Sequence, residues 1–345
     1  MKIPGSKKFQ QAVRRVQKRL ASSKGLILMY HRIAEVDIDP WSLCVTPQHF
    51  AEQMQVLQQY SHPLSLKQFV QAHRDGNIPH QAVVVTFDDG YADNLHHAKP
   101  ILELYDIPAT VFVSTGYIGK EHEFWWDELE QLLLQPGKLP EKLSLNISGS
   151  LEHWELGQAA NYTEQDYHSD RTSKAHKAKP GSRMFFYYSI WQVLLPLPEG
   201  ERRKILNEIL IWANAKPIAR HNYRSLLPQE LSVLAQGNLV EIGAHTVTHP
   251  FLSSLPVVMQ QDEIQVSKTY LEEIINLPVT SFSYPFGDRT TETVELTRTA
   301  GFDCACSTVA DIIWQQSDCF QLPRFGVENW NGEEFAKQLL RWFHS

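Results

Sequence analysis

The sequence predicts an α/β fold, in which a parallel sheet or barrel is interrupted by one long insertion. Short apolar runs recur along the chain, and most are followed by a segment with apolar residues at helical spacing. The runs do not alternate with polar residues, which is typical of strands buried on both faces of a parallel sheet. This pattern stops near residue 119 and resumes near residue 231.

The first part of the predicted barrel contains three buried strands. Residues 25–30 read Gly-Leu-Ile-Leu-Met-Tyr, and residues 82–87 read Ala-Val-Val-Val-Thr-Phe. Residues 109–114 form the third run. Helices are predicted between these strands at 47–60 and 94–105, and this alternation favours parallel strands.

The same alternation returns after the insertion. Strands are predicted at 240–244, 281–284 and 304–308, and helices at 256–276 and 290–300. The α/β pattern therefore spans two separated parts of the chain.

The insertion, residues 119–230, is polar and irregular between 141 and 182. Within it, Leu143 to Ile147 and Leu151 to Leu156 flank Ser-Gly-Ser, which predicts a hairpin. Residues 184–215 and 228–236 are predicted as helices.

The expected domains are a basic amphipathic helix at 1–22, a barrel from 23–118 and 231–345, and the insertion. The first 20 residues carry seven basic side chains and no acidic one. Apolar residues lie on one face of that helix, at Phe9, Val13, Val16 and Leu20. Such a helix either contacts an anionic membrane surface or docks on the domain with its charges in water.

Composition narrows the classes of protein. The net charge of −7 argues against a nucleic-acid partner. No apolar run could cross a bilayer, and the N-terminus lacks the apolar middle region of a secretory signal. We therefore expect a cytoplasmic protein, with peripheral contact to the inner membrane face as an alternative. The four cysteines suit reduced thiols, and we interpret Cys304 and Cys306 as buried small side chains of a strand.

Polar residues follow the predicted strands, where α/β folds place their sites. Asp88 and Asp89 end the second strand in Thr-Phe-Asp-Asp-Gly. Adjacent carboxylates point to opposite sides, so one can bind a metal while the other acts on a proton. A turn or helix cap is the alternative.

His245 and His249 follow the strand at 240–244. Two imidazoles four residues apart can converge on one cation if the backbone makes one turn. With Asp89 they form a set that suits Zn²⁺, although cobalt, nickel or iron fit too. Three protein ligands leave a position for water, and Asp88 is the predicted base that takes the proton of that water.

The third strand end reads Ser283-Tyr-Pro-Phe-Gly. A turn with Pro285 can aim the N–H of Phe286 at an oxyanion. Tyr284, Pro285 and Phe286 are therefore predicted to bind substrate, with an ordinary exit from the strand as the alternative.

These three segments resemble the motifs of the polysaccharide deacetylases with a NodB-homology domain, family four of the carbohydrate esterases. The resemblance covers about 25–118 and 231–327 and leaves the insertion unexplained. It implies a distorted (β/α) barrel with fewer strands than an eightfold one. It also implies a divalent metal on Asp89, His245 and His249, hydrolysis of N-acetyl or sometimes O-acetyl groups on a glycan, and Asp88 as base.

The sequence departs from that family's pattern at two positions. Ser283 stands where an arginine usually begins the third motif, and no late Leu-x-His is seen after residue 300. Both gaps resemble the deacetylases of poly-N-acetylglucosamine, in which an early Tyr-His supplies the acid. By that resemblance His31 is the expected general acid, with a capping histidine as the alternative. Arg324 is the predicted replacement for the missing arginine, held in an ion pair with Asp88.

Three function classes stay open at this point. The first is an N-deacetylase of glycans, and the second is an O-acetyl esterase or a deacetylase of a lipid-linked sugar. The third is a carbohydrate-binding relative that has lost catalysis. Trp125, Trp126 and Trp191 are interpreted as core or interface residues, with sugar stacking as the alternative. The oligomeric state cannot be predicted.

Overall fold

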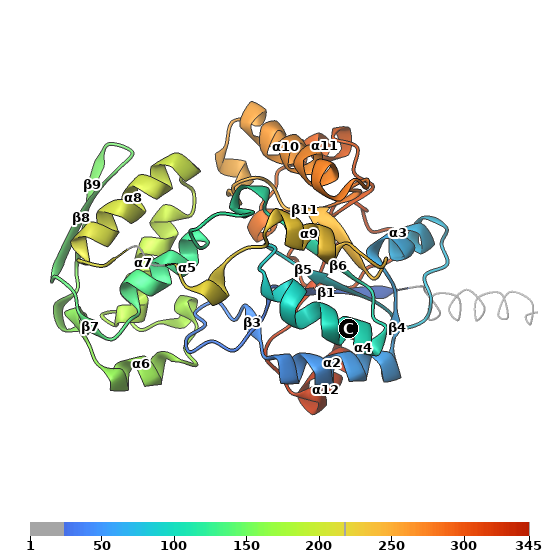
Figure 1. Cartoon of the computed structure of the whole chain (residues 1–345), viewed down its shortest axis with the longest axis horizontal. Coiled ribbons are helices and arrows are strands. Elements are labelled where there is room, and N and C mark those ends of the chain that lie inside the picture. Colours follow the sequence, from blue (N-terminus) through green and yellow to red (C-terminus); the bar gives the residue numbers. More distant parts are fainter. Residues whose placement is uncertain (1–23, 217–218, 345) are drawn as a thin grey trace, which may run out of the picture.

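A sheet of eight strands forms the centre of the larger of two lobes (Figure 1). The computed structural model describes residues 24–216 and 219–344, so the helix predicted at 1–22 lies outside the described residues. Seven strands follow the order β13-β12-β11-β6-β5-β1-β14, and β4 pairs with β5. The strands are β1 Gly25–Tyr30, β4 His62–Pro63, β5 Ala82–Phe87, β6 Ala109–Val113, β11 Val240–Ala244, β12 Ser281–Ser283, β13 Cys304–Cys306 and β14 Phe325–Gly326. All pairs in this sheet are parallel.

One segment joins the two edges of the sheet. Phe325 of β14 pairs with Leu28 of β1, and Leu322 forms a parallel bridge with Cys306 of β13. Residues 322–326, which include β14, therefore pair with β1 on one side and with β13 on the other, and so close the sheet. The distorted barrel that the sequence predicts is confirmed.

Helices surround this sheet. They are α2 Pro47–Tyr60, α3 Leu66–Arg74, α4 Lys99–Tyr105, α9 Pro228–Leu234, α10 Val257–Ile275, α11 Thr291–Thr299 and α12 Gly332–His344. In Figure 1, α10 and α11 lie on one side of the sheet, and α2, α4 and α12 on the other. α2 shows how the sequence sets an element: Thr46 caps it by accepting from the N–H of His49, and Phe50, Met54 and Leu57 are buried. The sequence did not predict α3 or α12.

The second lobe is formed by residues 125–212 and has its own core, rich in aromatic side chains. Its elements are α5 Trp125–Leu133, β7 Gly137–Lys138, β8 Lys142–Ile147, β9 Ser150–Glu155, β10 Asn161–Tyr162, α6 Glu164–Asp170, α7 Arg183–Leu194 and α8 Glu199–Trp212. The predicted hairpin is present as β8 and β9. The helical range predicted at 184–215 is present as the two helices α7 and α8. They are separated at Pro196 and Pro198, which lack the N–H that a continuous helix needs.

The boundary between the two lobes differs in detail from the predicted insertion. α9 buries Leu231 and Leu234 in the barrel core. In the opposite direction, Ile38 and Trp41 belong to the aromatic core of the second lobe. They come from the loop between β2 (Arg32–Ile33) and β3 (Cys44–Val45). The domain boundaries themselves stay a prediction.

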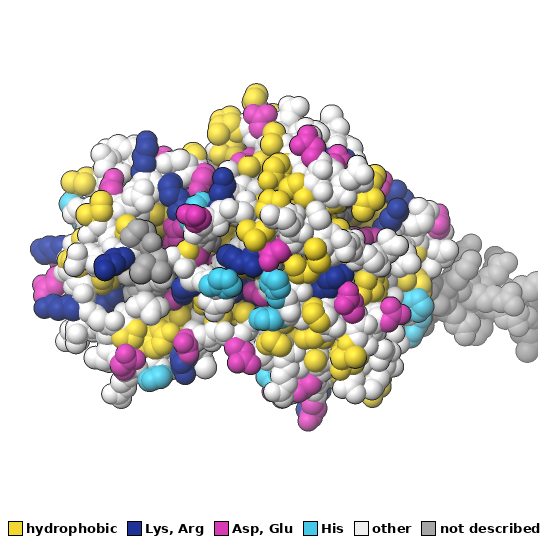
Figure 2. Space-filling view, in the orientation of Figure 1, with side chains coloured by type: hydrophobic (Ala, Val, Ile, Leu, Met, Phe, Trp, Pro, Cys, Tyr) yellow, Lys and Arg dark blue, Asp and Glu magenta, His cyan; other side chains and the backbone are white. Residues whose placement is uncertain are grey.

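The surface carries charges of both signs. Figure 2 shows basic and acidic side chains interspersed over both lobes, with apolar side chains over α10. No helix within 24–216 or 219–344 is long and apolar enough to cross a membrane.

Candidate active site

The carboxyl ends of the parallel strands meet at one cavity of about 210 Å³. It is lined by His31, Trp41, Leu43, Asp88, Asp89, Trp126, Trp191, His245, His249, Phe286 and Thr308. Residues that follow β1, β5 and β11 thus converge, as expected for parallel strands. All three predicted motifs contribute at least one side chain to it.

The turns that carry these side chains have unusual backbone geometry. Asp89, His249 and Phe286 have positive φ angles of 75°, 53° and 56°. Non-glycine residues rarely adopt this region, and such strain often accompanies function. Gly90 has φ +82°, and a Cβ there would lie 2.8 Å from a methyl group of Val113. The glycine of the Asp-Asp-Gly motif is thus required by conformation and by close packing.

Asp89, His245 and His249 form a cluster of buried donors. Their ligand atoms lie within 4.8 Å of one another. The Nε2 atoms of His245 and His249 lie 3.6 Å and 3.3 Å from Oδ1 of Asp89. Donors about 2.1 Å from a tetrahedral metal are roughly 3.4 Å apart, so these distances fit Zn²⁺. The three residues could therefore hold one cation.

The protonation of this cluster also suits a metal. Nδ1 of His245 donates to the carbonyl of Ser283 at 2.7 Å, so its Nε2 is free to be a ligand. Burial lowers the pKa of His249 to about 4, which keeps this imidazole neutral. Burial alone would raise the pKa of Asp89, but the contacts from both histidines outweigh it and lower the pKa. Nδ1 of His249 is buried and has no hydrogen-bond partner among the described residues.

Asp88 is held by Arg324 in a buried pair. Two nitrogens of the guanidinium each donate to one carboxylate oxygen at 2.7 Å. The other three N–H groups donate to Thr86, Ser283 and the carbonyl of Ser307. All five donors of Arg324 are therefore used, and its side chain is fully buried.

This pair keeps Asp88 ionised. Burial would raise the pKa of the carboxyl, but the charge and hydrogen bonds of Arg324 outweigh burial and lower the pKa. The pairing that the sequence predicted for Asp88 and Arg324 is thus present in the structure. The sequence did not indicate that the hydroxyl of Ser283 would lie beside both, accepting from Arg324 at 2.8 Å.

The remaining predicted residues separate into two groups. His31 and Phe286 line the cavity, and the Phe286 ring lies 4.6 Å from that of His249. Tyr284 and Pro285 do not line it. Tyr284 is wholly buried, and its hydroxyl donates to the carbonyl of Phe320. The Tyr284 side chain thus does not reach the cavity, and substrate binding by Tyr284 and Pro285 stays a prediction.

Sequence reasoning missed residues that support or line the site. Glu263 of α10 accepts from the N–H groups of Val247 and Thr248 at 2.7 and 2.8 Å, and so fixes the loop between the histidines. Trp41 and Leu43 line the cavity, and no motif marked them. Of the three tryptophans considered, Trp126 and Trp191 line it, whereas Trp125 is fully buried.

Cys304 and Cys306 are buried free thiols on β13, as interpreted from the sequence. Burial raises the pKa of both thiols. The thiolates that a metal would need are therefore disfavoured.

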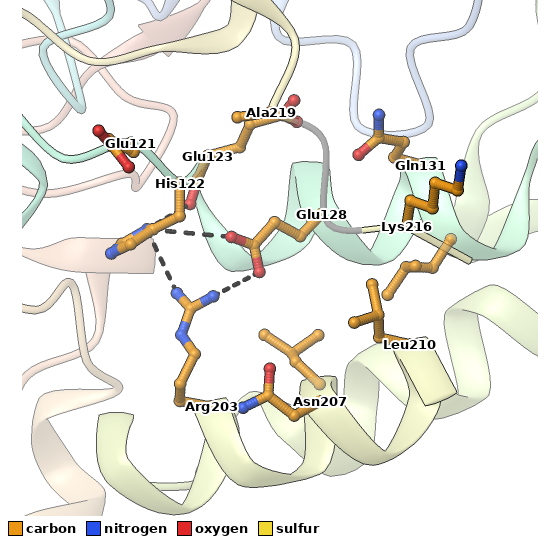
Figure 3. A pocket seen from close by; sticks show the side chains of 12 residues that line it. Glu121, His122, Glu123, Glu128, Gln131, Arg203, Asn207, Leu210, Lys216 and Ala219 are labelled. Carbon is orange, nitrogen blue, oxygen red and sulfur yellow. Dashed lines mark hydrogen bonds and ion pairs between the residues drawn. The ribbon is translucent and has the colours of Figure 1, made fainter. Parts of the chain in front are cut away.

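A larger cavity of about 380 Å³ lies between α5 and α8 (Figure 3). Arg203 and Glu128 form an ion pair in it, with His122 beside them (Figure 3). These charged groups satisfy one another, and the cavity is not at the strand ends. We therefore take the smaller cavity, with its metal-ligand cluster, as the candidate active site.

Residues 75–137 and 208–305 match the family model of the polysaccharide deacetylases. A putative polysaccharide deacetylase of Bacillus subtilis, YxkH, is 31% identical over 108 residues, which are 31% of this chain and 37% of the relative. The poly-β-1,6-N-acetyl-D-glucosamine N-deacetylase of Staphylococcus aureus is 29% identical over 113 residues. That match covers 29% of this chain and 39% of the relative. The matches thus span less than half of either relative.

Solved structures share the fold. The Streptococcus pyogenes deacetylase PplD aligns with a TM-score of 0.53 and 20% identity, over 93% of this chain and 99% of that one. IcaB from Ammonifex degensii aligns with a TM-score of 0.57 and 17% identity, over 94% and 98%. The family match, the fold and the strand-end motifs together identify a polysaccharide deacetylase domain in this chain.

Proposed function

We propose that this protein hydrolyses N-acetyl groups of an amino-sugar polymer, such as poly-N-acetylglucosamine, with the aid of a divalent metal. The observation that carries the proposal is the buried Asp88–Arg324 pair beside the cluster of Asp89, His245 and His249. A carbohydrate-binding protein would gain little from an ionised carboxylate that is fixed next to a metal-ligand set.

Asp89, His245 and His249 would hold the metal, and Zn²⁺ suits their donor atoms. When bound, such a cation supplies a Lewis acid that acidifies water and polarises the acetyl carbonyl. The cobalt, nickel and iron ions bind similar donors, so the metal is to be established by measurement.

The chain's own residues would move the protons. Asp88, kept ionised by Arg324, would take one proton from the attacking water. His31, on the same cavity, would give a proton to the leaving nitrogen. The water oxygen forms a bond to the acetyl carbon, the carbon–nitrogen bond breaks, and acetate and a free amine result. The N–H of Phe286 would stabilise the negative charge that develops on the carbonyl oxygen.

The test is an acetate-release assay on the full chain, loaded in turn with zinc, cobalt, nickel or iron. We expect release from N-acetylated glucosamine oligomers and none from the Asp88→Asn variant. Release from O-acetylated sugars alone would favour an esterase. Stoichiometric metal without release from either substrate would overturn the proposal in favour of a binding protein.

A further inference from the structure

Aromatic side chains form part of the lining of the candidate cavity, beside its charged groups. Three partly exposed rings form this part of the lining: Trp41, Trp191 and Phe286, here called the aromatic wall. The centroids of Trp41 and Trp191 are 4.2 Å apart, and those of Trp191 and Phe286 are 6.2 Å apart. Since Phe286 also contacts His249, the wall extends from the β2–β3 loop to the metal-ligand cluster.

The wall is held rigidly from behind. Trp125, fully buried, stacks with Trp191 at 5.9 Å. Nε1 of Trp41 donates to the hydroxyl of Tyr187 at 2.7 Å. The carboxylate of Asp39 accepts from the N–H groups of the two residues after Ser42, at 2.9 and 2.8 Å, and so fixes the turn that carries Trp41.

These contacts support Trp41 and Trp191 while each ring stays partly exposed at the cavity. A preorganised apolar surface that stays open to water gains free energy when a ligand covers it. A wall that served only to join the two lobes would bury these faces as completely as it buries Trp125.

Trp41 and Trp191 both lie outside the segments that match the family, 75–137 and 208–305. The metal-ligand and proton-transfer candidates within those segments come from the barrel. The wall is mainly supplied by the β2–β3 loop and by α7 of the second lobe. The wall is thus supplied mostly from outside the matched segments, and Phe286 is its member within them.

We infer that the aromatic wall selects the substrate by stacking on the apolar C–H face of a single N-acetylated pyranose unit. This inference rests on the proposed function. The cavity, at about 210 Å³, is smaller than the roughly 300–1,000 Å³ of pockets for drug-sized ligands, so it admits one sugar unit instead of a length of polymer. Trp191 is the central residue, because it contacts both other rings of the wall.

The experiment compares Trp191→Ala with Trp212→Ala in the full chain. Trp212 is a half-buried tryptophan of the same lobe that packs on Phe186 and does not line the cavity. The substrates are a β-1,6-linked N-acetylglucosamine trimer and 4-nitrophenyl acetate, which has no sugar ring. Calorimetric binding of the trimer to the metal-free chain gives a readout that does not depend on turnover.

For Trp191→Ala we expect the KM and the dissociation constant for the trimer each to rise about tenfold, the factor that corresponds to about 1.4 kcal/mol. The KM for the acetate ester, whose nitrophenyl ring can also contact the wall, should rise less than the KM for the trimer, and Trp212→Ala should alter neither. Trp191→Phe should restore most of the trimer affinity, because it keeps a ring.

Equal losses on both substrates, or unchanged trimer affinity in a folded variant, would overturn the inference. If Trp191→Ala does not fold, Trp191→Leu keeps the apolar volume without the ring and should show the same selective loss. The native chain could also release no acetate and still bind the trimer in a way that depends on Trp191. That result would refute the proposed reaction and support the role of the aromatic wall in binding.

Discussion

The two lobes bury carboxylates in different ways. At the barrel's strand ends, Asp88 receives both arms of the Arg324 guanidinium, and its pKa is lowered although burial acts in the opposite direction. In the second lobe, burial raises the pKa of Asp127 to about 8. Its closest partner is the neutral hydroxyl of Tyr91, at 2.6 Å.

The difference between Asp88 and Asp127 arises from which groups accept the hydrogen bonds of the nearby arginines. Arg220 lies near Asp127 but pairs with Glu123 and Glu130, at 2.7 and 2.6 Å, and reaches only the carbonyl of Asp127. Burial therefore dominates at Asp127, whereas a dedicated counter-charge dominates at Asp88. Asp88 is thus fixed as an ionised carboxylate at the strand ends, whereas Asp127 accepts from Tyr91, whose hydroxyl also accepts from Trp126.

The largest expected effect is loss of the metal-ligand cluster. His249→Ala removes one of three donors, so we expect the rate of acetate release to fall at least about 1,000-fold, or about 4 kcal/mol. Bound metal should fall with it. The exposed His153 of β9 offers the control, since His153→Ala should leave both unchanged. Full activity in His249→Ala would show that acetate release does not depend on the metal-ligand cluster.

Arg324→Ala tests the counter-charge itself. The variant leaves Asp88 buried without its partner, so the free energy of unfolding should fall by about 3–5 kcal/mol. Turnover should fall about 100-fold, because the base loses its fixed position, while metal content stays intact. Chemical denaturation and metal analysis measure these effects.

Arg298 provides the matched control for that change. It pairs with Asp318 on the surface, so Arg298→Ala should cost less than about 1 kcal/mol. Unchanged turnover in Arg324→Ala would show that Arg324 does not position Asp88 for catalysis.

Glu263→Ala tests how the histidine loop is held. Without the carboxylate, the N–H groups of Val247 and Thr248 lose their acceptor, and His249 loses its fixed direction. We expect the metal dissociation constant to rise about 10- to 100-fold. The exposed Glu273 on the same helix is the control. Equal metal affinity in the Glu263 and Glu273 variants would show that the loop is rigid without this contact.

The sequence predicted the barrel well because buried parallel strands leave a local signal. β1, β5 and β11 lie at the predicted residues, and their carboxyl ends meet as their topology requires. The closing segment with Leu322 and Phe325 was not predicted. It pairs with its neighbours over only a few residues, so its sequence contains no long apolar run.

Some residues of the candidate site could likewise be predicted from the sequence, and others could not. Asp88, Asp89 and the histidines carry motif signals, and Arg324 could be assigned by looking for a missing charge. Trp191 was noted with sugar stacking only as the alternative. Trp41 could not be found, because only tertiary packing brings a loop after β2 next to α7. A side chain that acts through its face leaves no spacing rule in the sequence.

The last prediction concerns stability alone and is a pH dependence from the second lobe. Asp127 is protonated in the folded chain up to about pH 8, but an unfolded chain ionises it near its ordinary pKa of about 3.9. Between these values the folded state binds the extra proton, so stability falls as pH rises, by up to about 1.4 kcal/mol per pH unit. Asp127→Asn cannot titrate, yet it still accepts from Tyr91. Its stability relative to the native chain should therefore rise between about pH 4 and pH 8 in urea unfolding experiments.

The barrel supplies the control of opposite sign. Burial alone would raise the pKa of Asp318, but hydrogen bonds, including those from Arg298, lower it. Asp318→Asn should therefore lose relative stability as pH rises towards about 4, and show no further change above it. Parallel pH curves for Asp127→Asn and the native chain would mean that Asp127 is ionised in the fold. In that case Arg32 or Arg220 would neutralise it, and the two lobes would treat buried carboxylates alike.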